Sequence, residues 1–368
     1  MLRKKLNIFI IHFLYKDKDK DKMFLTILEF VLCLNKLKFN TLQLLSETSN
    51  DVKDEIDKIQ LSVRSNISNF NIPRTITTRY KIISLDFTMR NISEENLKNL
   101  LQLILQCNAL KDLSLRNNQI GSEGAIKLAA VLRQCERLRL TNLDLKNNNI
   151  GPEGIKSLAS VLLADRLTLE SPLETVLGKC NSLTSLTSLT SLDLSNNKFG
   201  DTGIKYLEQL LSQLGSLAIL NLSEIQIGPN GAESLASVLK KLSSLNHLDL
   251  SYNNIDSLGT QKLSLIFPQC SSLSHLNLSN NQIGPEGTKS LAAVLPYCGS
   301  LTLLDLSSNR IGPIGAEELA AMLPKCNVIS YLYLESNYVG PSGARSLAKA
   351  KSECSSLKHL FYKDYKLY

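Results

Sequence analysis

Cysteine is the residue whose recurrence in this sequence first suggests chemistry. Seven of the eight cysteines fall at one position of a repeating pattern, just before a strand-like segment. An even total is compatible with disulfides, but a small buried hydrophobic thiol also explains one recurring position. No Cys-x-x-Cys pair occurs, so the usual zinc pattern is missing. We expect buried, reduced thiols at Cys107, Cys135, Cys180, Cys270, Cys298, Cys326 and Cys354. Disulfides and metal binding are the alternatives. Reduced thiols are typical of cytoplasmic proteins.

Histidine is the second candidate for chemistry. Three of the four histidines, His247, His275 and His359, share one position of the pattern. The first two fall on adjacent predicted strands, so they should be near neighbours. Polar side chains on an exposed sheet explain them, and a pH-sensitive contact or a two-histidine metal site is the alternative. A metal would need further ligands, so we predict neither a metal nor a cofactor.

Motifs for catalysis are missing from the sequence. No nucleophile elbow, phosphate-binding loop or His-Glu-x-x-His motif occurs. The Gly-Pro-Glu-Gly segments at 151–154 and 284–287 recur as helix-entry turns and are not a dinucleotide fingerprint. We predict that the protein is not an enzyme and has no catalytic residues.

The candidate residues are positioned by an internal repeat of about ten units, and such repeats decide a fold. The second leucine of a Leu-x-Leu pair steps by 28 residues from Leu194 to Leu334. Leu-x-Leu has the alternation of a strand, and residues 151–162 place apolar side chains at helical spacing. One strand and one helix cannot bury their apolar faces alone, whereas stacked copies can. The repeat predicts a right-handed α/β solenoid with a parallel concave sheet and convex helices.

An asparagine follows the strand of most units. A buried amide at this point can form hydrogen bonds with backbone groups of neighbouring units, which would otherwise be buried without a partner at a cost in free energy. Arg90 takes the position in the degenerate first unit, and Ile225 takes it in mid-array, where we expect a weak point with loosened turns. We predict a structural ladder at Asn118, Asn148, Asn197, Asn253, Asn281, Asn309 and Asn337.

The unit resembles the ribonuclease inhibitor-type leucine-rich repeat, through Leu-Asp-Leu-Ser-Asn-Asn at 192–197, Ile-Gly-Pro-Glu-Gly at 283–287 and the cysteine near each helix end. Similar arrays occur in NLR immune receptors and in the GTPase-activating protein for Ran. The resemblance covers residues 79–368 and implies a horseshoe fold, but fold does not carry function. The Ran activator uses an exposed arginine beside the strand ends, where Arg90 and Arg116 lie here. Ordinary surface arginines explain these two better.

Outward-facing strand residues are the candidates for partner binding. They are polar and mildly acidic in the middle of the array and aromatic in the C-terminal units. Aromatic side chains on a polar surface are typical of binding hot spots. The alternative is capping of the last unit, with Tyr362, Tyr365 and Tyr368. We predict contacts with basic or aromatic groups of a protein or peptide at His247, Asp249, His275, Asp305, Tyr331, Tyr333, Glu335, His359 and Phe361.

The region before the repeats divides into two segments. Residues 1–39 have a basic start and an apolar run too short to span a bilayer. We expect a poorly ordered leader or a mis-assigned start, with a membrane or partner anchor and a secretion signal as alternatives. Residues 40–78 contain helical spacing of apolar residues over 46–66. We predict a helical cap there, covering the N-terminal end of a repeat domain at 79–368.

The spacing breaks once, between Leu145 and Leu194, which lie 49 residues apart, 21 more than one unit. The excess falls around residues 165–188 and includes two spare Leu-Thr-Ser triplets. Only Leu189, Leu192, Leu194 and Asn197 together satisfy the template, so they fix the strand register. We interpret the excess as a duplication beside a broken repeat, in a loop that tolerates insertion. A binding loop is the alternative.

Composition places the chain among globular proteins, at 43% hydrophobic and 20% charged residues. The net charge of +7, of which +4 precedes residue 79 (13 Lys/Arg against 9 Asp/Glu), is not the clustered basic face that nucleic acid requires. We predict a cytoplasmic, non-catalytic scaffold that binds a protein or peptide on its concave strand face. Regulation of an enzyme through that face, as inhibitor or GTPase-activating protein, is the alternative. A fragment or decoy of a larger receptor is a third interpretation.

Overall fold

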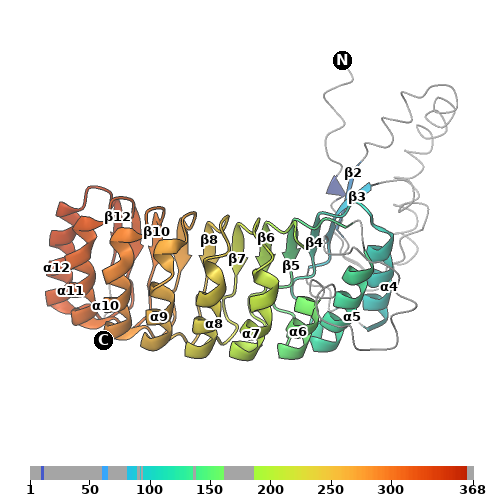
Figure 1. Cartoon of the computed structure of the whole chain (residues 1–368), viewed down its shortest axis with the longest axis horizontal. Helices are drawn as coiled ribbons and strands as arrows, with labels where there is room; N and C mark the ends of the chain where they lie inside the picture. The colour runs from blue at the N-terminus through green and yellow to red at the C-terminus, as the bar shows by residue number, and fades with distance from the viewer. Residues whose placement is uncertain are drawn as a thin grey trace, which may run out of the picture.

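The computed structural model describes residues 10–11, 60–64, 81–88, 92, 94–135, 138–160 and 186–362. Within them, strands and helices alternate along one elongated array, with the helices in one layer and the strands in another (Figure 1). This is the leucine-rich repeat α/β solenoid that the repeat predicts.

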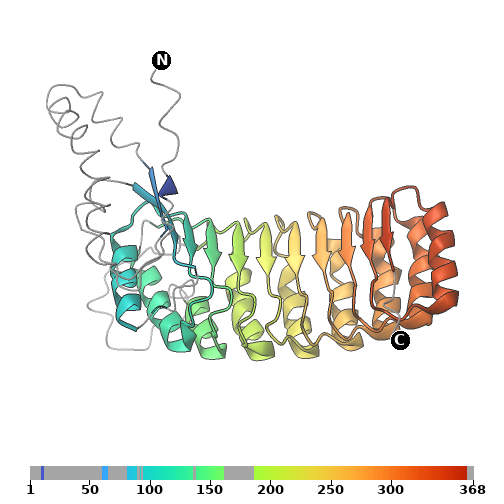
Figure 2. The same ribbon diagram turned by 180° about the vertical axis from the view of Figure 1, so that it is seen from behind.

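The strands form a single parallel sheet in chain order (Figure 2). Leu304 pairs with Leu332, one 28-residue unit further on (332 − 304). In the described residues the strands are β1 Ile10–Ile11, β2 Gln60–Arg64, β3 Lys81–Asp86, β4 Asp112–Ser114, β5 Asn142–Asp144, β6 Ser191–Asp193, β7 Ile219–Asn221, β8 His247–Asp249, β9 His275–Asn277, β10 Leu303–Asp305, β11 Tyr331–Tyr333 and β12 His359–Phe361. From β4 onward each strand has three residues, the first leucine of the Leu-x-Leu pair and the residue on either side of it. In β9 and β11 this leucine is buried between two outward residues.

The helices pack side by side on the other side of the sheet. Three of them run into a short 3-10 turn: η2 Phe267–Gln269, η3 Leu295–Tyr297 and η4 Leu323–Lys325. In the described part of the chain, no helix is long and apolar enough to cross a membrane. The helices are α4 Glu94–Gln106, α5 Gly121–Gln134, α6 Pro152–Ser160, α7 Gly200–Leu211, α8 Pro229–Leu239, α9 Ser257–Ser264, α10 Gly284–Val294, α11 Gly312–Met322 and α12 Gly340–Glu353.

The Gly-Pro-Glu-Gly turn explains how a helix starts so soon after a strand. Gly284 has a φ of +62°, in the left-handed region that glycine adopts at no steric cost. The second glycine is needed for close packing, because a Cβ at Gly287 would lie 2.8 Å from Ile283 Cγ2 and 3.1 Å from Ser257 Cα. The turn therefore lets each helix approach its neighbour closely.

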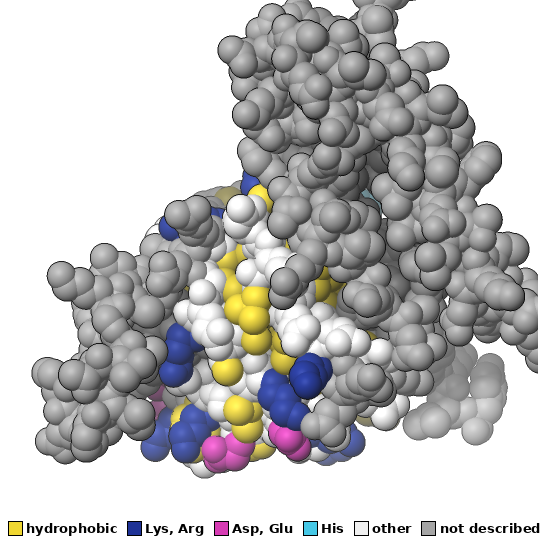
Figure 3. Space-filling view, turned by 90° about the vertical axis from the view of Figure 1, so that its right-hand side faces the viewer, with side chains coloured by type: hydrophobic (Ala, Val, Ile, Leu, Met, Phe, Trp, Pro, Cys, Tyr) yellow, Lys and Arg dark blue, Asp and Glu magenta, His cyan; other side chains and the backbone are white. Residues whose placement is uncertain are grey.

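One continuous hydrophobic core fills the space between sheet and helices. Leu248 and Leu276 on the strands and Leu291 on α10 are fully buried. Seen from the α4 end, hydrophobic side chains of the described residues form a band down the middle of the face, with charged side chains near its lower edge (Figure 3).

The predicted helix over 46–66 is wrong at its C-terminal end. Residues 60–64 form strand β2, which pairs in parallel with β3. The helical spacing of Ile56, Ile59 and Val63 is local information, whereas the open edge of β3 offers hydrogen bonds that no local pattern reveals. The rest of the predicted helix, Arg90 and most of the 1–39 leader lie outside the described residues.

The predicted strand register at the spacing break is confirmed. Leu192 pairs with Leu143, and Asp193 pairs with Asp144, although 49 residues separate each pair (192 − 143). Leu186 and Leu189 are buried in the core just before this strand. Residues 161–185, which hold most of the excess and Cys180, lie outside the described residues.

Candidate functional site

The predicted asparagines lie buried between neighbouring units. Asn281 is representative: its Nδ2 donates to the carbonyl oxygens of Leu250 and Leu278, at 2.9 and 3.0 Å. Its Oδ1 accepts the N–H of Ile255 at 3.0 Å. The other six make the same pair of carbonyl bonds, one within their unit and one to the preceding unit. These hydrogen bonds join neighbouring units of the array.

Ile225 interrupts this ladder. Its own N–H donates to Asn253 Oδ1 at 3.2 Å, and its side chain is fully buried. A hydrocarbon cannot donate to the carbonyl oxygens of Leu194 and Leu222, nor accept from the preceding unit. The N–H of Phe199 consequently bonds to the backbone carbonyl oxygen of Asn197 at 2.8 Å. At the equivalent position of the preceding unit, the N–H of Ile150 bonds instead to a ladder side chain, through Asn197 Oδ1.

The strand face, defined as the solvent-facing side of β3 to β12, carries the predicted partner-binding residues. Asp249 and Asp305 have a structural contact there that sequence reasoning missed. Each accepts a hydrogen bond at 2.9 Å from the N–H two residues on, that of Ser251 and Ser307 respectively. The Asp/Asn-x-Ser spacing that recurs at both places was the available signal.

The two histidines expected to be neighbours are in contact. His247 and His275 are paired in register, and their rings stack with centroids 5.4 Å apart. Burial and the neighbouring His275 lower the pKa of His247, against the opposing effect of Asp249. Ser274 Oγ lies 2.8 Å from His275 Nδ1.

The C-terminal units bring four rings together on the strand face. Tyr331 stacks on His359 and Tyr333 stacks on Phe361, each pair with centroids 4.8 Å apart and nearly parallel ring planes. His359 and Phe361 lie 6.1 Å apart along β12. We call these four residues the aromatic cluster. Tyr331 and Phe361 remain 36% and 40% exposed, whereas Tyr362 packs against the core.

Carboxylates lie directly beside the aromatic cluster. Asp305 pairs in register with Tyr333, and Glu335 accepts a hydrogen bond from Ser307 Oγ at 3.0 Å. Burial raises the pKa of Asp305, and the negative charges of Glu335 and Asp249 add to that rise. Among the described residues, neither carboxylate takes part in an ion pair.

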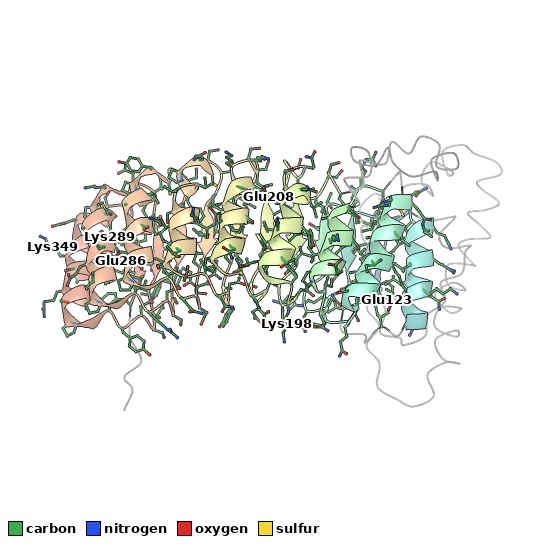
Figure 4. All side chains as sticks on the ribbon, turned by 60° about the horizontal axis from the view of Figure 1, so that its bottom comes forward. Glu123, Lys198, Glu208, Glu286, Lys289 and Lys349 are labelled. Atoms are coloured by element: carbon green, nitrogen blue, oxygen red, sulfur yellow. The ribbon has the colours of Figure 1, made fainter. Side chains whose placement is uncertain are left out.

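The helix face, defined as the solvent-facing side of α4 to α12, differs from the strand face. Its charged side chains form ion pairs within helices and between neighbouring helices. Lys289 on α10 reaches Glu318 on α11 at 3.7 Å, and Lys262 reaches Glu233 at 2.8 Å. Glu208, Glu286, Lys289 and Lys349 project from the helices in Figure 4. These exposed pairs contribute little stability.

The cysteines of the described units are free thiols in a buried row, as the repeat predicts. Burial raises the pKa of Cys298 and Cys326 to about 12. In the part of the chain that the structure describes, no group of three or more metal-ligating side chains converges. The described thiols are Cys107, Cys135, Cys270, Cys298, Cys326 and Cys354, of which Cys135 alone is half-buried.

Arg116 is the one described member of the two arginines considered for GTPase activation. Its positive charge helps to lower the pKa of Asp144, which burial raises overall. The Nε atom of the Arg116 guanidinium is buried and makes no hydrogen bond.

Comparisons with known proteins identify the repeat class. A family model described as "MHP1/HER1/GIP3 LRR domain", a leucine-rich repeat family, matches residues 75–363. No curated protein gives a significant match.

Two solved structures give matches of low similarity. A structure titled "Leiomodin-1 Actin-Binding Site 2 (ABS2)" is 14% identical, with 45% of this chain and 79% of that chain covered and a TM-score of 0.32. The tropomodulin C-terminal domain of Caenorhabditis elegans is 14% identical, with 36% and 83% covered and a TM-score of 0.30. Likenesses this low carry no argument about function.

Proposed function

We propose that this chain, which belongs to the MHP1/HER1/GIP3 LRR domain family, is a non-catalytic interaction module that binds a protein or peptide on the C-terminal part of its strand face. The observation that carries the proposal is the aromatic cluster, because its rings stand on a strand face that is mostly polar, with Ile219 and Leu303 as apolar exceptions. Rigid aromatic side chains lose little conformational entropy on binding and provide large contact areas.

The scaffold supports this assignment. The asparagine ladder and the continuous core fix each strand against the next. Adjacent strands in a sheet are about 4.8 Å apart, so neighbouring units present their outward side chains as one preformed surface. Preorganisation of this kind lowers the entropic cost of binding.

Several finer points belong to the same proposal. We infer a ribonuclease inhibitor-type repeat from the residues that resemble it, and a cytoplasmic scaffold from the free thiols, which reducing compartments favour. The modest net charge of +7 gives no reason to expect a nucleic acid partner.

Affinity capture from a lysate with quantitative mass spectrometry tests the proposal, with the full chain as bait. The Tyr331→Ala/Tyr333→Ala double variant should lose partners that the unaltered chain retains. Tyr297→Ala is the matched control, because Tyr297 is 72% exposed on the helix side, in η3. Equal capture by all three baits would place the binding surface elsewhere.

Regulation of an enzyme through the same face is the alternative function. Its GTPase-activating form requires an arginine free to reach a nucleotide, whereas the Nε atom of Arg116 is buried. Measurement of GTP hydrolysis by small GTPases, with and without the chain and its Arg116→Ala variant, separates this alternative from simple binding.

A further inference from the structure

We propose that the aromatic cluster, together with Asp305 and Glu335, recognises an arginine side chain in an extended segment of the partner protein. This inference rests on the proposed function, because it names the chemistry of the group that the C-terminal strand face would bind. It concerns the part of the strand face where β10, β11 and β12 lie side by side.

The stacking geometry leaves one face of an aromatic ring available. Tyr333 stacks on Phe361 of β12 with an interplanar angle of 7°. Because the strands are in register, the opposite face of the Tyr333 ring is turned toward β10, where its partner is Asp305. Aspartate is shorter than tyrosine, so a planar group laid on this ring face would continue the stack above the carboxylate.

The carboxylates of Asp305 and Glu335 favour a positively charged ligand. In the described residues, no ion pair involves Asp305, Glu335 or Asp249, whereas five lysines of the helix face have acidic partners. The backbone N–H of Ser307 occupies one oxygen of Asp305, and its hydroxyl occupies one oxygen of Glu335. These bonds engage Asp305 Oδ1 and Glu335 Oε2, and the partner would bond to the other oxygen of each carboxylate.

Arginine fits this combination better than lysine. Its guanidinium is planar, stacks on aromatic faces and donates in its own plane to carboxylates. Lysine is a compact, strongly hydrated charge that gains less from a flat ring. The outward side chain of Leu303, opposite Tyr331, can pack against the aliphatic part of an arginine side chain.

Fluorescence anisotropy with a short labelled peptide tests the inference. The probe is a capped peptide in which two arginines flank a phenylalanine, and its counterparts carry citrulline or lysine in place of arginine. Citrulline keeps the planar shape and loses the charge. We expect the arginine peptide to bind the full chain, with affinity reduced by about tenfold for citrulline and severalfold for lysine.

The protein variants separate charge from structure. Asp305→Asn/Glu335→Gln removes both charges and keeps one acceptor oxygen on each side chain, and Asn277 shows that asparagine makes the same turn at this strand position. We expect this variant to bind the arginine peptide about tenfold more weakly. Asp193→Asn/Glu224→Gln is the matched control for charge, since Asp193 makes the same backbone bond on β6, and it should bind within about twofold of the unaltered chain.

Two outcomes would overturn the inference. One is binding of the arginine and citrulline peptides with equal affinity, or of neither peptide. The other is full retention of binding by Asp305→Asn/Glu335→Gln. Failure of the inference remains distinct from failure of the proposed function: captured partners lost from Tyr331→Ala/Tyr333→Ala but kept by Asp305→Asn/Glu335→Gln contradict only the arginine assignment.

Discussion

The ring of Tyr333 stacks on the ring of Phe361 with centroids 4.8 Å apart and an interplanar angle of 7°. The separation matches the spacing of adjacent strands, so the stack follows directly from the register of β11 and β12. The aromatic cluster is therefore a rigid surface whose geometry the scaffold sets.

Asp305→Asn should stabilise the fold at neutral pH. The pKa of Asp305 is raised by burial and by like charges, so its ionised form is disfavoured in the folded state. This cost is absent below the unfolded pKa of about 3.9 and appears as the pH rises through the raised folded value. Thermal unfolding should give a higher Tm for the variant at pH 7 and equal Tm values near pH 3. A lower Tm at pH 7 would contradict the prediction. A stabilised variant that loses binding would indicate that the carboxylate serves function at the expense of stability.

His247→Asn should weaken the dependence of stability on mildly acidic pH. The folded pKa of His247 is lowered, chiefly by burial and then by His275. Neutral His247 contributes to the stability of the fold. This contribution is fully present above the unfolded pKa of about 6.5 and is lost as the pH falls toward the lower folded pKa. Asn142 holds the equivalent place on β5, so asparagine suits the position. Urea unfolding at several pH values between about 7.5 and 5.5 should show a smaller loss for the variant than for the unaltered chain. An identical loss in both would show that His247 does not contribute.

Much of this surface was predictable because a repeat converts sequence position into spatial position. Tyr331 and His359 lie one 28-residue unit apart (359 − 331), and the structure pairs them in register. The bond from the Ser307 N–H to Asp305 was missed, although the Asp-x-Ser spacing was its signal in the sequence. The pairing of β2 with β3 could not be predicted from the local sequence pattern, because it depends on a strand that lies further along the chain.

Hydrogen exchange should be faster around Ile225 than at equivalent places in other units. The ladder amide missing there leaves fewer bonds between the turns of consecutive units, and local opening needs less free energy where such bonds are few. Exchange followed by mass spectrometry should show weaker protection for residues 194–200 and 222–228 than for 250–256 and 278–284. The latter segments contain Asn253 and Asn281, with all their carbonyl bonds. Equal protection of the two sets would contradict the weak point.

The buried thiols should resist modification in the folded protein. Burial raises the pKa of Cys107 to about 12 and of Cys270 to about 11, so the reactive thiolate is scarce at neutral pH. In a Cys33→Ser/Cys180→Ser background, the six described thiols should react with a disulfide reagent only after denaturant is added. Half-buried Cys135 should react first. Rapid modification of several thiols without denaturant would contradict the buried row.

Site-specific photo-crosslinking tests most directly whether the strand face binds a partner. A benzoylphenylalanine placed at Tyr333 reports contacts of the aromatic cluster, and one placed at Tyr297 reports contacts of the helix side, where that ring is well exposed. The proposed function predicts specific protein adducts from position 333 that are missing from position 297. Adducts from position 297 alone, or the same adducts from both positions, would contradict it.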